Sequence, residues 1–182
     1  MNVHAIICTR SREDISETTD KLLTYLSNCG IKVYLITEAK SIFSAYAGAY
    51  KKINPDENDL IIFCHDDIEI RSNRVLFMEE LSKSLNDKST GFVGAAGTTK
   101  LGESAVWWDH DLWKQGFHKG KVTHIYNKKE EDTFYGPPGE VVALDGLFLA
   151  ARTHVIEDIR LSKPDYFEGE WDFYDIHYTT QA

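Results

Sequence analysis

The first half of the chain alternates three apolar, strand-like runs with three helical patterns, and this alternation constrains the fold most strongly. The apolar runs cover 3–9, 31–37 and 60–63. Apolar residues at helical spacing follow each run, at 11–29, 41–52 and 74–85. Strands that alternate with helices are typical of a mostly parallel sheet with helices on both faces. The sequence therefore predicts an α/β fold of the Rossmann-like kind, an α/β/α sandwich.

Composition and charge limit the number of domains and the class of partner. The chain has 182 residues, of which 42% are hydrophobic, so we expect one domain over residues 1–182. Acidic residues number 29 against 20 basic ones, and the formal charge of −9 disfavours nucleic acid as a partner. No apolar run approaches the ~20 residues that span a bilayer, and no signal peptide is evident at the start. We expect a cytoplasmic protein, and the sequence is compatible with docking on the inner face of a membrane.

The second half of the chain is less regular. A glycine-punctuated strand is predicted at 91–97, and a buried strand interrupted by an Asp-Gly pair at 141–150. Three tryptophans lie between them, either as a binding wall or lid or packed beneath a long connection; they are Trp107, Trp108 and Trp113. The end of the chain is rich in carboxylates and aromatics and leads into an unfinished helix.

Two acidic motifs carry candidate chemistry, and each has two interpretations. His65-Asp66-Asp67 follows the third apolar run, where parallel strands present ligand-binding groups. Its carboxylates suit Mg²⁺ or Mn²⁺ held with a diphosphate, but they could equally cap the next helix or lie in a turn. Asp175 lies near a helix start, either as a base for a hydroxyl or as a charge that favours the helix dipole.

Several common motifs are absent from the sequence. It contains no Walker motif, no GxGxxG and no GxSxG. This absence argues against a P-loop nucleotide hydrolase, a dinucleotide-dependent oxidoreductase and an α/β-hydrolase.

The order of the motifs is more specific than any one of them. It runs through Cys8-Thr9-Arg10, Thr37-Glu38-Ala39, Phe63-Cys64-His65-Asp66-Asp67, Leu144-Asp145-Gly146 and Phe173-Tyr174-Asp175. This succession resembles the family-two-like glycosyltransferases of the GT-A fold, in the branch with His-x-Asp in place of the Asp-x-Asp metal motif. Such enzymes usually continue through another strand, so the resemblance implies that the C-terminal part of the fold is incomplete here.

The resemblance implies a nucleotide-sugar site in the half 1–90. Residues at three strand ends would bind the donor, namely Thr9, Arg10, Glu38, His65 and Asp66. Asp67 matches the metal ligand for Mn²⁺ or Mg²⁺.

The half 91–182 would hold the acceptor. Asp145 and Gly146 match the floor of the acceptor site, and Asp175 matches the catalytic base of the inverting enzymes. In this chain Tyr174 replaces the Glu of the usual Glu-Asp pair.

Three candidate functions can be compared against these motifs. The first is a metal-dependent, inverting glycosyltransferase that moves a sugar from a nucleotide-diphosphate donor to a hydroxyl of a glycan or lipid-linked acceptor, in polysaccharide or glycoconjugate synthesis. The second is a non-catalytic nucleotide-sugar-binding module on the same scaffold. The third is a nucleotidyltransferase, which is disfavoured because no glycine-rich, basic triphosphate loop occurs near the N-terminus.

Overall fold

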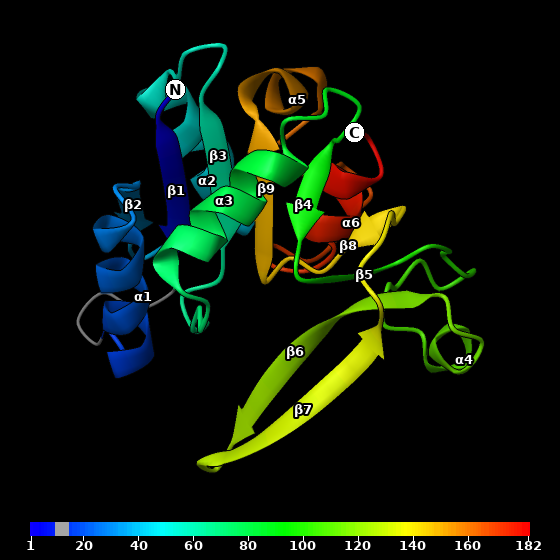
Figure 1. Ribbon diagram of the computed structural model, residues 1–182. Coiled ribbons are helices and arrows are strands. Elements are labelled where there is room, and N and C mark those ends of the chain that lie inside the picture. Colours follow the sequence, from blue (N-terminus) through cyan, green and yellow to red (C-terminus); the bar gives the residue numbers. More distant parts are fainter. Residues whose placement is uncertain (10–14) are drawn as a thin grey trace.

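The central sheet has five strands in the order β2-β1-β3-β9-β4 in this computed structural model, which describes residues 1–9 and 15–182 (Figure 1). The strands β1 (Val3–Cys8), β2 (Lys32–Ile36) and β3 (Leu60–Cys64) are parallel, with β1 between the other two. The strand β9 (Phe148–Arg152) runs antiparallel to both β3 and β4 (Phe92–Gly94). Four of these five strands therefore share one direction, and because β9 pairs antiparallel with both of its neighbours the sheet is mixed.

Helices cover both faces of this sheet. Side chains alternate between the two faces along each strand, so each face presents its own set of residues for a helix to pack on. The helices α1 (Glu17–Asn28) and α3 (Arg74–Ser84) pack on one face, in a core that contains Leu22, Leu26 and Leu81. The opposite face is covered by α2 (Ile42–Ile53), α5 (Thr153–Asp158) and α6 (Tyr174–Thr179). The α/β/α arrangement is thus confirmed. None of the helices in the described part of the chain is long and apolar enough to cross a membrane.

The two strands predicted in the second half each break into two pieces that join different sheets. The first gives β4 and β5 (Ala96–Thr98), and the second gives β8 (Ala143–Leu144) and β9. The strands β5 and β8 belong to a second sheet, in the order β7-β6-β5-β8. The Asp-Gly pair marks the crossing, since Asp145 N–H donates to Ala96 O at 2.9 Å whereas Leu147 O accepts from His65 N–H at 3.1 Å. The pair is a corner between the sheets.

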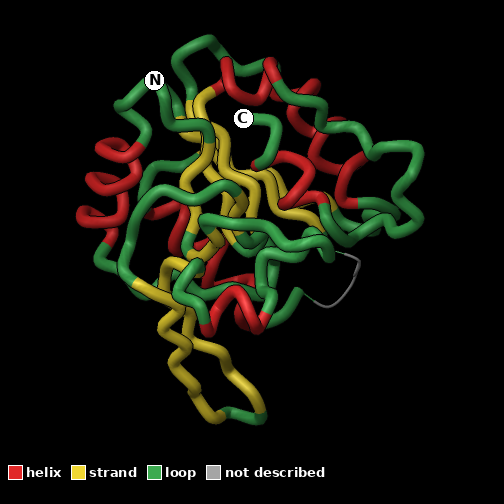
Figure 2. The backbone as a smooth tube through the Cα atoms, turned by 90° about the vertical axis from the view of Figure 1, so that its right-hand side faces the viewer, coloured by secondary structure: helices red, strands yellow, loops and turns green. Residues whose placement is uncertain are grey.

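A long hairpin that the sequence did not reveal projects from the body in both views (Figures 1 and 2). It joins β6 (His118–Tyr126) to β7 (Lys129–Gly136). Its turn residues Asn127 and Lys128 have φ of 50° and 65°, as a two-residue turn between right-handed strands requires. Five of the eight residues of β7 are exposed and the first four are charged, so the hairpin lacks the alternation of apolar and polar residues that identifies a strand. The short helix α4 (His110–Lys114) precedes it.

A buried polar cluster joins the starts of β1 and β3. The Asp59 carboxylate accepts from Asn2 N–H at 2.6 Å and from Asp56 N–H at 3.2 Å, and lies 3.1 Å from His4 Nε2. His4 and Asp59 are 4% and 2% exposed. Burial alone would raise the pKa of Asp59, but the hydrogen bonds from Asn2, His4 and Asp56 outweigh it and hold that pKa below its usual range.

Asp59→Ala is expected to lower the free energy of unfolding by about 2–4 kcal/mol at pH 7, because it leaves buried donors without an acceptor. Since the folded-state pKa lies below the unfolded value, the effect should be complete at pH 7 and shrink as the pH falls below about 4. Urea denaturation measures it. The exposed neighbour Glu57 provides the control Glu57→Ala, and an equal loss in both variants would contradict the assignment.

Candidate active site

Tyr174 joins three predicted site segments at the corner between the sheets. Its hydroxyl donates to Gly146 O at 2.7 Å and lies 2.7 Å from His65 Nε2. Because the single hydroxyl proton goes to Gly146, the hydroxyl accepts from His65, whose ring then carries a proton on Nε2. Sequence reasoning treated Tyr174 only as a replacement for Glu, and no local signal indicates a contact with His65, 109 positions away.

Asp175 binds the other backbone group of the same residue, Gly146. Its Oδ2 accepts from Gly146 N–H at 3.0 Å and its Oδ1 from Ile176 N–H at 2.8 Å, and the residue is 7% exposed. Burial raises the pKa of Asp175 to about 6; the Ile176 N–H opposes this rise and the nearby Asp145 charge adds to it. A carboxylate with this pKa suits a general base near neutral pH. Asp175 also lies in the first turn of α6, so its charge favours the helix dipole as well.

Asp145 and Gly146 lie directly beside this carboxylate. Burial raises the pKa of Asp145, and the Leu147 N–H, which donates to its Oδ1 at 2.8 Å, opposes that rise. A Cβ on Gly146 would lie 2.5 Å from Tyr174 Cζ and 3.0 Å from Asp175 Cβ, so only glycine fits. The structure therefore brings together the residues predicted for the acceptor floor and for the base.

The acids of the His65-Asp66-Asp67 motif do not cap the next helix, because Asn73 Oδ1 caps α3 by accepting from Val75 N–H at 2.9 Å. The Asp66 backbone is tied to α1, where Thr19 Oγ1 donates to Asp66 O at 2.7 Å. The Asp67 side chain is 80% exposed, and its Oδ1 lies 3.9 Å from His65 Nδ1. This arrangement leaves the Asp67 carboxylate accessible to a ligand, beside a His65 side chain that is 40% exposed.

The chemistry of these side chains fits a magnesium or manganese ion that a diphosphate helps to hold. Such an ion commonly takes one or two protein carboxylates and completes its coordination with phosphate oxygens and water. In residues 1–9 and 15–182, no group of three or more His, Cys, Asp or Glu side chains is arranged to hold a metal by itself. An ion here would therefore depend on the donor for further ligands.

Two further donor-side predictions, Thr9 and Glu38, follow the carboxyl ends of β1 and β2, at the same edge of the sheet as the end of β3 (Figure 1). Thr9 is buried, and its backbone links the two strand ends: its N–H donates to Ile36 O at 2.9 Å and its O accepts from Ala39 N–H at 3.1 Å. Glu38 is exposed, with φ of 54°. Arg10, the other residue predicted at this edge, lies outside the described residues.

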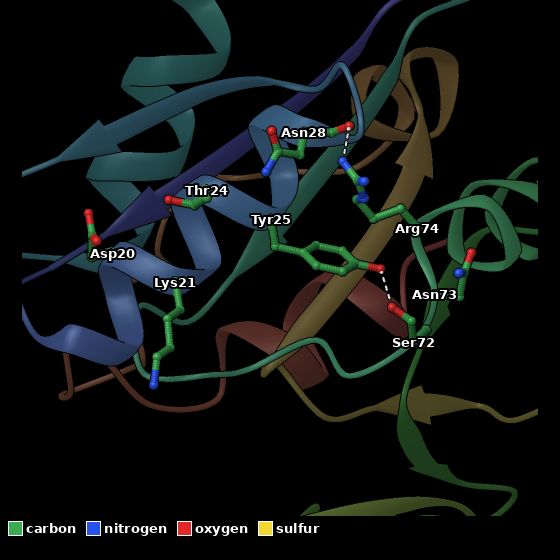
Figure 3. Close-up of a pocket in the computed structure, with 8 residues that line it drawn as sticks. All are labelled: Asp20, Lys21, Thr24, Tyr25, Asn28, Ser72, Asn73 and Arg74. Atoms are coloured by element: carbon green, nitrogen blue, oxygen red, sulfur yellow. Dashed lines mark hydrogen bonds between the residues drawn. The ribbon is translucent and has the colours of Figure 1, made fainter.

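A hollow between α1 and the segment before α3 does not coincide with this site (Figure 3). Tyr25 Oη donates to Ser72 O across it at 2.9 Å, and Arg74 Nη1 donates to Asn28 O at 3.3 Å. None of the residues that line it belongs to the donor, acceptor or base set. The site is therefore defined by its hydrogen bonds rather than by this hollow.

A mixed α/β sheet of the GT-A-like kind, with acids at one strand edge, defines the class of protein, and sequence comparison gives the family. The chain belongs to a glycosyltransferase-like family, whose model matches residues 5–182. It is 32% identical over 146 residues to the streptomycin biosynthesis protein StrF of Streptomyces griseus, covering 77% of this chain and 47% of that protein. The chain thus spans about half the length of this curated relative.

A solved structure supports the fold alone. The structure of A197 from STIV matches with a TM-score of 0.51 and 14% sequence identity, covering 99% of this chain and 77% of that one. Together, the family match and the α/β architecture of this chain bear out the single-domain, GT-A-like fold expected from the order of the motifs.

Proposed function

We propose that this chain transfers a sugar from a nucleotide-diphosphate donor to a hydroxyl acceptor, with inversion and with the help of a divalent cation. The main support for the proposal is the environment of Asp175. Its pKa is raised to about 6, and it lies at the corner where Gly146 and Tyr174 connect it to His65. The family match supports a glycosyltransferase. The cytoplasmic location and the role in polysaccharide or glycoconjugate synthesis stay predictions from the sequence.

Asp175 would act as the general base. Because the pKa of Asp175 is about 6, its carboxyl group is ionised in most molecules at pH 7 and can accept the proton of the acceptor hydroxyl. As the acceptor oxygen bonds to the anomeric carbon, the bond from that carbon to the diphosphate breaks, and the nucleoside diphosphate leaves with the bonding electrons. A single displacement of this kind inverts the configuration at the anomeric carbon. Asp145 and Gly146 would form the floor on which the acceptor rests.

The strand edge would bind the donor. Thr9 and Glu38 would border the nucleotide, as would Arg10 by resemblance, while His65 and Asp66 would lie against the ribose and diphosphate. Asp67 would hold Mn²⁺ or Mg²⁺, whose charge stabilises the departing diphosphate. The exposure of the Asp67 side chain supports this role, because the ion and the donor must reach it from solvent.

A UDP-sugar or GDP-sugar with Mn²⁺ is expected to raise the melting temperature, since a ligand that binds the folded state stabilises it by mass action, and Asp67→Ala should abolish that rise. Thermal shift with a panel of nucleotide sugars, with and without Mn²⁺, measures both effects. The control is Glu69→Ala, which removes an acid two residues further on. No shift with any nucleotide sugar, or the same shift in the Asp67 variant, would contradict the donor site.

The second candidate is a non-catalytic module that binds a nucleotide sugar. It is favoured by the state of Asp175, whose two oxygens both accept backbone N–H groups and which is only 7% exposed. Donor binding without transfer or donor hydrolysis, over a panel of hydroxyl acceptors, would select this module over the enzyme.

A further inference from the structure

Two aromatic rings from distant parts of the chain lie together beside the candidate base. The rings of Trp108 and Phe173 are nearly parallel, with 18° between their planes and 6.4 Å between their centroids. They remain 52% and 40% exposed. Because Phe173 directly precedes α6, the pair lies next to the turn that carries Tyr174 and Asp175.

Each ring is supported by another aromatic residue. Trp107, which is 3% exposed, packs edge-on against Trp108 at 6.1 Å and against Tyr135 at 5.3 Å. Phe173 packs against Phe167 at 6.2 Å. Rings supported in this way lose little freedom when a ligand covers them, so they form a preorganised surface.

The backbone at Phe173 gives a second reason to look for a ligand. Its φ is 58°, in the left-handed region that bulky residues rarely adopt. Glycine or asparagine would be the ordinary choice there, whereas this chain places a large, partly exposed ring. Residues held in such conformations cluster at functional sites.

The charge around the two rings indicates the chemistry of the ligand. The segments 103–114 and 163–177, which carry the rings, contain eight acids against two lysines, and one of these lysines, Lys163, is paired with Glu170. A phosphate would be repelled here, whereas a neutral ligand with many hydroxyl groups could donate hydrogen bonds to the carboxylates. A pyranose ring combines such hydroxyls with a face of C–H groups, which packs on the electron-rich face of an aromatic ring.

We propose that Trp108 and Phe173 form a platform for the sugar ring of the acceptor, so that the acceptor of the proposed transfer is a saccharide. This inference rests on the proposed function, because Asp175 is the base that would serve the bound hydroxyl.

A nucleobase is the alternative occupant of an aromatic platform, and the test below distinguishes the two. The segment before Phe173 also reaches the start of α2, where Ile42 N–H donates to Glu170 O at 3.0 Å, close to the β2 end that carries Glu38.

Saturation-transfer NMR tests the platform without any donor. The probes are the methyl β-glycosides of glucose, galactose and N-acetylglucosamine, with cyclohexylmethanol as a ring that lacks the sugar's hydroxyls. Wild type is expected to saturate at least one glycoside, most strongly at its axial C–H protons, and to saturate it more than cyclohexylmethanol. Trp108→Ala and Phe173→Ala should each weaken the best glycoside about tenfold or more, and Trp108→Phe less. The control Phe134→Ala removes a ring that is 63% exposed on the hairpin, and it should bind as wild type does.

Several results would overturn the platform. They are no saturation of any glycoside by wild type, equal saturation of cyclohexylmethanol, an equal loss in Phe134→Ala, or a Trp108→Ala variant that loses UDP or GDP binding instead. Melting temperatures within the range of the control variant confirm that the rings, and not folding, cause the loss. Donor binding depends on Asp67 and is measured separately, so glycoside binding without donor binding would reject the proposed function alone. Donor binding without glycoside binding would reject the platform alone.

Discussion

Asp175→Asn is expected to lower kcat for sugar transfer by about 10²–10⁴-fold while donor binding stays near the wild-type level, because it removes the base and keeps the size of the side chain, although its amide nitrogen replaces one of the two oxygens that accept backbone N–H groups. Initial rates with the best nucleotide sugar, together with its thermal shift, measure the two effects. Transfer at the wild-type rate by this variant would exclude Asp175 as the base.

The pH dependence provides an independent check on the same residue. Since the base acts when ionised and the pKa of Asp175 is about 6, kcat/KM should fall about tenfold per pH unit below about pH 6. The contribution of Asp175 to folding stability changes with pH in the opposite direction. A carboxyl whose pKa rises on folding binds more protons in the folded state, so its contribution to stability falls as the pH rises from about 4 to about 6. The difference in unfolding free energy between wild type and Asp175→Asn should change over this same window.

Gly146→Ala is expected to disrupt the whole corner. The new Cβ would lie 2.5 Å from Tyr174 Cζ, and Tyr174 is 3% exposed, so its ring has little room to move away. We expect a loss of about 1–3 kcal/mol in the free energy of unfolding, as for other overpacked sites. Transfer should fall about 100-fold or more, because a displacement near 1 Å at a reacting centre has this effect. Urea denaturation and initial rates measure the two losses.

Two further variants separate crowding from the loss of a hydrogen bond. Gly139→Ala is the matched control, since a Cβ there meets only Lys119 Cε at 3.9 Å. Tyr174→Phe keeps the ring but removes the hydroxyl that joins His65 to Gly146. An unchanged rate in Gly146→Ala would show that this corner does not support the reaction.

The first half of the molecule was predictable because its signals are local. Alternating apolar and helical segments predict β1, β2 and β3 with their helices, and the parallel order places Thr9, Glu38 and His65 at one sheet edge. The second half was not predictable in this way. Its predicted strands at 91–97 and 141–150 divide between two sheets, and the β6–β7 hairpin has few apolar residues to reveal it.

The sequence by itself determined the class of fold and the residue types at the strand ends, since short-range periodicity and the order of motifs carry that information. Only the tertiary structure decided which of those residues act together. Tyr174 reaches His65 across 109 positions, and Asp175 holds the Gly146 peptide across 29. Such contacts depend on how α6 packs against the corner between two sheets, and no local pattern encodes that packing. The same packing buries Asp175 and so raises its pKa to about 6.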